Sequence, residues 1–257
     1  MRRRWSLTTC TMVMVIALLL GDEAGAGIII TGSRHIYPER QREITIQLTN
    51  DDRHAPRLVK AWLEQADSQA RPESSDVPFS LSPPVFRIDA GKGQAMRLVY
   101  TREPLPADRE SLFWLNVLEV PPRALELTDE NQQKNLLRFA FRIRTKVFFR
   151  PAQLPGTPED AVGQLSWTLV QGLEGTTLQV SNASAYHITF NEIALAMGPQ
   201  PDASLVSAES GMVPPGATVR LAIQRRVSDV PANAQVHFKY INDFGAFSAP
   251  QRAALKF

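Results

Sequence analysis

Short runs of β-forming residues recur along almost the whole chain, and no long run with the 3.6-residue period of a helix interrupts them. In one such run Ile44, Ile46 and Leu48 alternate with Thr45 and Gln47, as in a half-buried strand. Comparable runs occupy residues 58–63, 79–81, 85–88, 94–100, 111–120 and 136–149. Many short strands at this spacing predict an antiparallel β-sandwich rather than a βαβ fold.

A domain boundary is expected at Arg150-Pro151. Residues 151–163 are rich in proline, glycine and small side chains, as linkers and domain starts often are. A second β series follows at residues 165–170, 177–181, 188–195, 218–223, 236–242 and 251–257. The sequence therefore predicts an all-β protein with two sandwich domains in tandem, residues 27–150 and 151–257, joined by almost no spacer.

The N-terminus has the features of a secretory signal peptide. Three arginines at positions 2–4 precede an apolar stretch at 12–20, and Ala24-Gly25-Ala26 provides a cleavage site. The apolar stretch is too short to span a bilayer, and Asp22 and Glu23 follow it directly. We expect residues 1–26 to be removed near Ala26 on export.

Composition argues against several classes of function. The single cysteine, Cys10, would leave with the signal peptide, so the mature chain has neither disulfide nor thiolate metal ligand. The formal net charge of +2 gives no reason to expect a nucleic-acid partner. The histidines lack metal-ligand spacing, and neither a Gly-x-Ser-x-Gly elbow nor a phosphate-binding loop occurs. No enzymatic activity and no cofactor are predicted. The four histidines are His35, His54, His187 and His237.

The last run of the first domain, residues 136–150, alternates large apolar side chains with arginines. One face would carry Leu137, Phe139, Phe141 and Ile143, and the other Arg138, Arg142 and Arg144. Two interpretations remain open. The run is either an ordinary core strand or a long strand whose N-terminal half overhangs the sandwich and presents its apolar side chains to a partner.

A family resemblance bears on this choice. Residues 105–122, LPADRESLFWLNVLEVPP, place a charged turn before an apolar strand that ends in a double proline. This segment resembles the signature segment of the periplasmic pilus chaperones of the chaperone–usher pathway, and the similarity covers nearly all of the mature chain. The resemblance implies two immunoglobulin-like domains with a cleft between them, and a periplasmic location.

The resemblance also implies a function without catalysis. Such chaperones bind, fold and cap pilus subunits by donor-strand complementation, and then deliver them to an outer-membrane usher. The strand at 136–150 would complete the subunit's unfinished fold without ATP. The implied donor residues are Leu137, Phe139, Phe141 and Ile143.

By the same resemblance, a basic pair in the cleft holds the C-terminal carboxylate of the subunit. The matching residues are Arg34 and Lys146. By residue type alone both would be solvated surface cations, and the resemblance favours the anchor role instead. Lys146 has the opposite strand parity to Phe139 and Phe141, so a bulge or a strong twist is expected near it.

The third set implied by the resemblance is a buried charged cluster between the domains, made by Glu110, Arg150 and Asp243. One guanidinium can serve two carboxylates because its donors form a planar fork. The alternative is three unrelated surface charges.

Two questions remain open: which branch of the family the chain resembles, and whether the free protein associates with itself. The stretch 122–137 looks longer than in short-loop members of the family, yet it lacks the cysteine pair of the long-loop members. We favour the short-loop branch, which serves rod-type pili. An exposed apolar stripe would also promote self-association. The rival interpretation is a secreted two-domain immunoglobulin-like adhesin or carbohydrate-binding protein.

Overall fold

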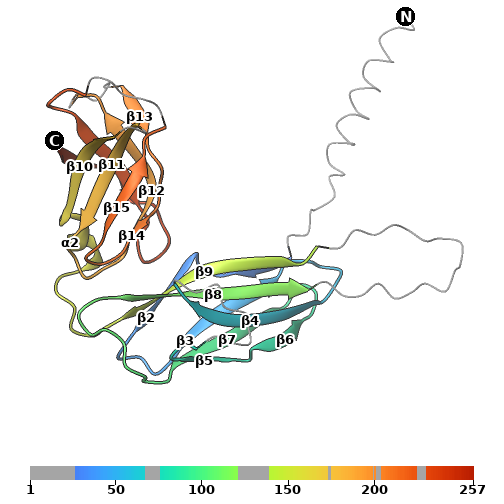
Figure 1. Ribbon diagram of the computed structural model, residues 1–257. Coiled ribbons are helices and arrows are strands. Elements are labelled where there is room, and N and C mark those ends of the chain that lie inside the picture. Colours follow the sequence, from blue (N-terminus) through green and yellow to red (C-terminus); the bar gives the residue numbers. More distant parts are fainter. Residues whose placement is uncertain are drawn as a thin grey trace, which may run out of the picture.

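The computed structural model describes residues 27–66, 76–120, 139–172, 175–198, 200, 204–224 and 230–257. Two β-domains meet at an angle, so the molecule has the shape of an L (Figure 1). The predicted signal peptide and the stretch 122–137, which includes Leu137, lie outside the described residues. Among the helices that the structure describes, none is long and apolar enough to cross a membrane.

The first domain is a sandwich of two sheets. One sheet has the order β1-β3-β7-β5, formed by Ile28–Ile30, Ile44–Asn50, Gly93–Tyr100 and Phe79–Ser82. The other has the order β2-β9-β8-β4-β6, formed by Arg34–Pro38, Phe141–Arg150, Ser111–Val120, Arg57–Gln65 and Val85–Ile88. Strands β2 and β9 are parallel, whereas the other pairs in this domain are antiparallel.

Alternation along the strands builds the core of the first domain. Ile46 and Leu48 on β3 belong to the same core cluster as Leu115 and Val117 on β8, and all four are fully or almost fully buried. An aromatic cluster closes the end of the core nearest the second domain. Its rings, which lie 4.6–6.4 Å apart between centroids, are those of Tyr37, Phe79, Tyr100 and Phe149.

The second domain is one curled sheet. It begins with the short helix α2, Pro158–Val162, and its strand order is β13-β12-β16-β17-β10-β11-β15, with β14 paired to β12. The strands are Leu165–Gly172 (β10), Gly175–Asn182 (β11), Ile188–Ala196 (β12), Leu205–Ser207 (β13), Met212–Val213 (β14), Thr218–Ala222 (β15), Gln235–Tyr240 (β16) and Gln251–Lys256 (β17). Trp167, Phe190 and Phe238 pack together inside it, with ring centroids 5.3–5.6 Å apart.

The all-β prediction is confirmed, with local differences. Helix α2 was not predicted, and it forms because Thr157 and Asp160 make a reciprocal capping box in front of Pro158. The short strands β1 and β2 were also missed. Ile28–Ile30 is a uniform apolar run without alternation, so pattern alone does not mark it as a strand.

Candidate functional site

One edge of β9 is open along half its length. Strand β8 pairs with β9 from Phe141 to Phe149, whereas β2 covers it only from Lys146 to Arg150. No other described strand pairs with the segment 141–145. The backbone groups of this segment that point away from β8 therefore form an unpaired edge, which can accept a further strand.

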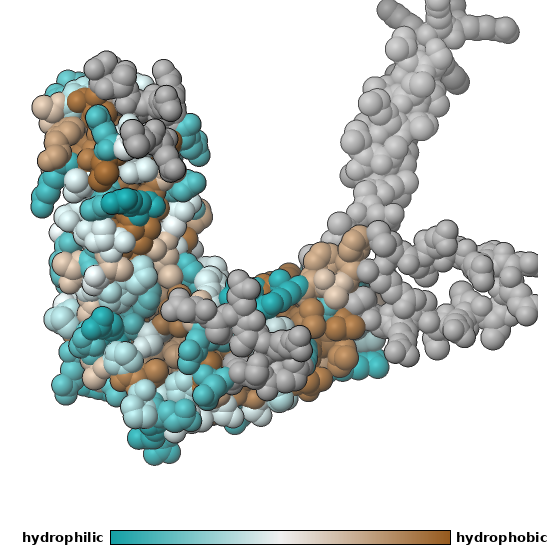
Figure 2. Space-filling model, in the orientation of Figure 1, coloured by the Kyte–Doolittle hydropathy of each residue, from teal (hydrophilic) through white to brown (hydrophobic). Residues whose placement is uncertain are grey.

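Large apolar side chains project beside this open edge. Phe139 and Phe141 are each 59% exposed, and their ring centroids lie 6.2 Å apart. Ile143 is half-buried, while Val147 and Phe149, further along the same face of β9, are core residues. The face that is core at one end of the strand is thus uncovered at the other. Figure 2 shows hydrophobic surface gathered on the first domain toward the end that lies away from the second domain.

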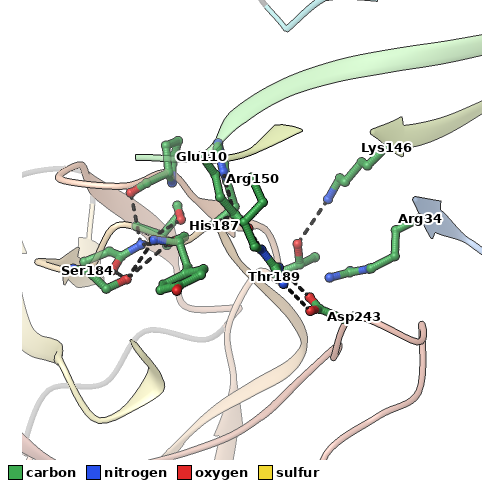
Figure 3. A network of polar contacts seen from close by, with 12 residues as sticks. Arg34, Glu110, Lys146, Arg150, Ser184, His187, Thr189 and Asp243 are labelled. Carbon is green, nitrogen blue, oxygen red and sulfur yellow. Dashed lines mark hydrogen bonds and ion pairs between the residues drawn. The ribbon is translucent and has the colours of Figure 1, made fainter. Parts of the chain in front are cut away.

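Arg34 and Lys146 lie directly opposite each other where the open edge ends. They are register partners in the parallel pair of β2 and β9. Arg34 is 9% exposed and donates from Nη1 to the carbonyl of Ile241 at 2.9 Å, and Lys146 Nζ donates to Thr189 Oγ1 at 3.3 Å (Figure 3). Among the described residues, no carboxylate forms an ion pair with either cation.

The electrostatics of this basic pair favour an incoming anion. Burial, with the nearby charge of Arg34 as a second cause, lowers the pKa of Lys146 to about 8. Burial also lowers the pKa of Arg34, which the charges of Asp243 and Glu110 partly offset. Two adjacent, desolvated cations without a paired carboxylate can be stabilised by an external one.

Of the bulge or strong twist expected near Lys146, the bulge is absent. The pairing of β8 with β9 runs without a register shift from Glu119–Phe141 to Ser111–Phe149. Lys146 therefore remains on the opposite face of β9 from Phe141. Lys146 and Phe141 need not lie on the same face of β9. A partner strand that pairs with the open edge, in the plane of the sheet, and ends beside Lys146 can contact both side chains.

The structure brings Glu110, Arg150 and Asp243 together between the domains. Arg150 donates from Nε to Glu110 at 2.8 Å, and from Nη1 and Nη2 to the two oxygens of Asp243 at 2.6 and 2.9 Å (Figure 3). Glu110 is 4% exposed. Burial alone would lower the pKa of Arg150, but the two carboxylates outweigh it and raise that pKa.

Two residues that complete this region were not predicted as site residues. His187 donates its backbone N–H to Glu110 at 2.8 Å, and its ring nitrogen Nδ1 lies 3.2 Å from the same carboxylate oxygen. The ring of Tyr186 lies 5.3 Å from the guanidinium carbon of Arg150. Neither residue stands in a motif. Their contacts with Glu110 and Arg150 arise only when the two domains dock, so the sequence alone does not reveal them.

The strand patterns around Trp62, Trp114 and Trp167 favour core packing for all three, and Trp114 departs from it. Trp167 belongs to a core cluster and Trp62 is buried, whereas Trp114 is only partly buried. Trp62 and Trp114 lie on the outer face of β4 and β8, beneath arginines of β9. Both fall in strand patterns, and the pattern alone does not show which face of the strand is covered by cations.

Two immunoglobulin-like domains, an open strand edge and a basic pair between the domains together define a pilus-chaperone architecture. The model of the pili and flagellar-assembly chaperone, PapD N-terminal domain, matches residues 27–155, and that of the pili assembly chaperone PapD, C-terminal domain, matches residues 160–252. The chain belongs to this family of pilus assembly chaperones, whose members are periplasmic.

Individual relatives agree. The chain is 37% identical over 239 residues to the probable fimbrial chaperone YadV of Escherichia coli K12, covering 92% of this chain and 94% of the relative. It is 35% identical to the chaperone protein MrkB of Klebsiella pneumoniae, covering 85% and 88%. The solved YadV chaperone matches with a TM-score of 0.71 at 35% identity, over 88% of this chain and 99% of that one. A Salmonella enterica SafA pilin–SafB chaperone complex matches with a TM-score of 0.68 at 27% identity, over 89% and 96%.

Proposed function

We propose that this protein, exported to the periplasm with cleavage near Ala26, captures pilus subunits by donor-strand complementation and delivers them to an outer-membrane usher. The observation that carries the proposal is the open half of β9 beside two exposed phenylalanines. The pilin–chaperone complex among the structural relatives supports a subunit as the partner. The activity is binding alone and needs neither cofactor nor ATP.

The open edge and its side chains have separate tasks in this proposal. Backbone groups of residues 141–145 pair with an edge of the subunit, and Phe139, Phe141 and Ile143 enter the groove left by its missing strand. Leu137, outside the described residues, would extend the same row. Burying each such anchor contributes roughly 1.5–3 kcal/mol before ordering costs.

The basic pair sets the register and direction of pairing. Strand β2 begins at Arg34 and occupies the edge of β9 from Lys146 onward, so an added strand must end beside Lys146. A segment that lies beside residues 141–145 and has its C-terminus at Lys146 runs parallel to β9, in line with β2. Its terminal carboxylate would then accept charge-assisted hydrogen bonds from Lys146 and Arg34.

Co-expression with a pilus subunit that lacks its final strand tests the function. We expect a soluble one-to-one complex in periplasmic extracts, because the subunit is kept from aggregating by the borrowed strand. Recovery of this protein in sheared surface material, with no subunit bound in the periplasm, would instead support the adhesin alternative.

The charged cluster has a geometric role in this proposal, since Arg150 joins a carboxylate on each domain. Asp243→Asn is expected to leave both domains folded and to broaden the distribution of angles between them. The reason is that the bidentate ion pair with Arg150 loses its negative partner. Small-angle scattering of the free protein measures this as an increased radius of gyration.

The matched control is Glu192→Gln. It removes the 2.8 Å ion pair between Glu192 and Lys239, which lies within the second domain. Scattering should then equal that of the wild type. A scattering curve for Asp243→Asn that also equals the wild type would contradict the geometric role.

A further inference from the structure

A buried carboxylate on β4 reaches across β8 to two arginines on β9. The Glu64 side chain is 1% exposed, and it accepts hydrogen bonds from Arg142 Nη2 at 2.7 Å and Arg144 Nη2 at 3.4 Å. It also accepts the indole N–H of Trp62 at 2.9 Å. Because the strand order is β9-β8-β4, these contacts span three strands of one sheet face.

Aromatic and amide side chains of β4 and β8 also contact the same two arginines. The guanidinium carbon of Arg142 lies 5.1 Å from the ring of Trp62, and that of Arg144 lies 4.5 Å from Trp114. Arg142 also donates twice to Asn116 Oδ1, at 2.9 and 2.7 Å. Each arginine thus has a cation–π contact and at least one charge-assisted hydrogen bond, although both side chains are more than 40% exposed.

The arginines that contact Glu64 lie on the half of β9 that has an open edge. Arg142 and Arg144 belong to the segment 141–145, where β9 has a described strand on one side only. An edge strand supported on one side opens locally more easily than a central one. The contacts to Glu64 are made by side chains of the segment that has no strand along its outer edge.

We propose that Glu64 is a positioning residue that holds the open half of β9 extended before a partner strand arrives. This proposal rests on the proposed function for its consequence in subunit capture. A segment already held in the bound conformation loses less conformational entropy on pairing, so association is faster. Once the subunit strand is in place it supports β9 from the other side, and Glu64 then matters little.

Glu64→Gln keeps the size of the side chain and removes its charge. In the free protein, hydrogen exchange of the β9 amides in residues 141–145 is expected to accelerate about tenfold, while the amides of β3 and β7 are unchanged. The association rate with a subunit should fall about tenfold, and the dissociation rate of the complex should stay the same. A purely structural role would change the thermal midpoint without separating the two rates.

Asp52→Asn is the control, because it removes the 2.6 Å ion pair with Arg57 in the same domain without touching β9. It should leave both exchange in residues 141–145 and the association rate unchanged. If Glu64→Gln does not fold, Arg142→Gln removes the shorter of the two contacts at a half-exposed position. It should produce the same two effects.

The outcomes separate this proposal from the proposed function. Unchanged exchange and association in Glu64→Gln and Arg142→Gln, with capture still lost in Phe139→Glu, would overturn the positioning role and leave the function standing. If the wild type captures no subunit, the proposed function fails, and exchange of the β9 amides alone still decides whether Glu64 holds the strand.

Discussion

Lys146→Met is expected to stabilise the isolated protein and to abolish recovery of a co-expressed pilus subunit. Burial of the Lys146 ammonium group beside Arg34 lowers the pKa of Lys146 to about 8. The charge of Lys146 is therefore unfavourable in the free protein. Methionine keeps the packing and removes this cost. In a complex, truncating one partner of a desolvated charge pair typically costs 2–5 kcal/mol, or about 30-fold to several thousandfold in affinity.

The same pKa predicts a pH dependence of opposite sign for folding and for binding. Unfolding restores an ordinary lysine pKa near 10.5, so the unfolded state binds more protons and wild-type stability rises between about pH 8 and that value. Subunit binding favours the charged amine, so affinity is level below about pH 8 and falls up to tenfold per pH unit above it. Lys146→Arg, which stays charged, should lose both dependences.

Thermal unfolding and co-purification from periplasm measure the two effects of Lys146→Met. Lys239→Met is the control, because Lys239 is a partly exposed lysine of the second domain, paired with Glu192. It should leave subunit recovery unchanged. Normal recovery with Lys146→Met would contradict the carboxylate anchor. Lys146 is a cleaner test than Arg34, because its hydrogen bond to Thr189 of the second domain is longer, at 3.3 Å, than the 2.9 Å bond from Arg34 to the same domain.

Phe139→Glu is expected to abolish subunit capture while leaving the isolated protein folded. The side chain is 59% exposed in the free protein, so a charge there remains hydrated. On capture the same charge would enter an apolar groove without a partner, which adds to the lost anchor and costs about 3 kcal/mol or more. Affinity should therefore fall more than a hundredfold.

A titration of subunit binding and a denaturation curve check both halves of this expectation. Leu205→Glu is the matched control, since Leu205 is 57% exposed and lies on β13 of the second domain. It should leave both measurements unchanged. Unfolding of the isolated Phe139→Glu protein would instead favour the ordinary core-strand interpretation of β9.

The sequence predicts the strands better than it predicts their surroundings. Ser111–Val120 and Val85–Ile88 occur at the predicted bounds, because turn residues mark both ends of each run. Alternation along β9 also separates the apolar face from the arginine face correctly. It does not show that this apolar face is covered at Phe149 and open at Phe141, because that depends on which side chains of the other sheet pack against it, as Phe79 of β5 does at Phe149.

Contacts across the domain boundary are harder still to predict. Glu110, Arg150 and Asp243 were grouped through a family resemblance, whereas His187 and Thr189 were not, because neither lies in a distinctive motif. Glu64 looks like an ordinary surface carboxylate at the end of a strand. Its burial follows from two arginines that lie 78 and 80 positions further along the chain.

A crystal structure of the complex with a pilus subunit tests the central claim most directly. The account predicts a subunit strand parallel to β9 beside residues 141–145, with its terminal carboxylate within hydrogen-bond distance of Lys146 Nζ and Phe139 and Phe141 inside the subunit. A subunit bound elsewhere, with this edge of β9 still open and both phenylalanines still in solvent, would contradict it.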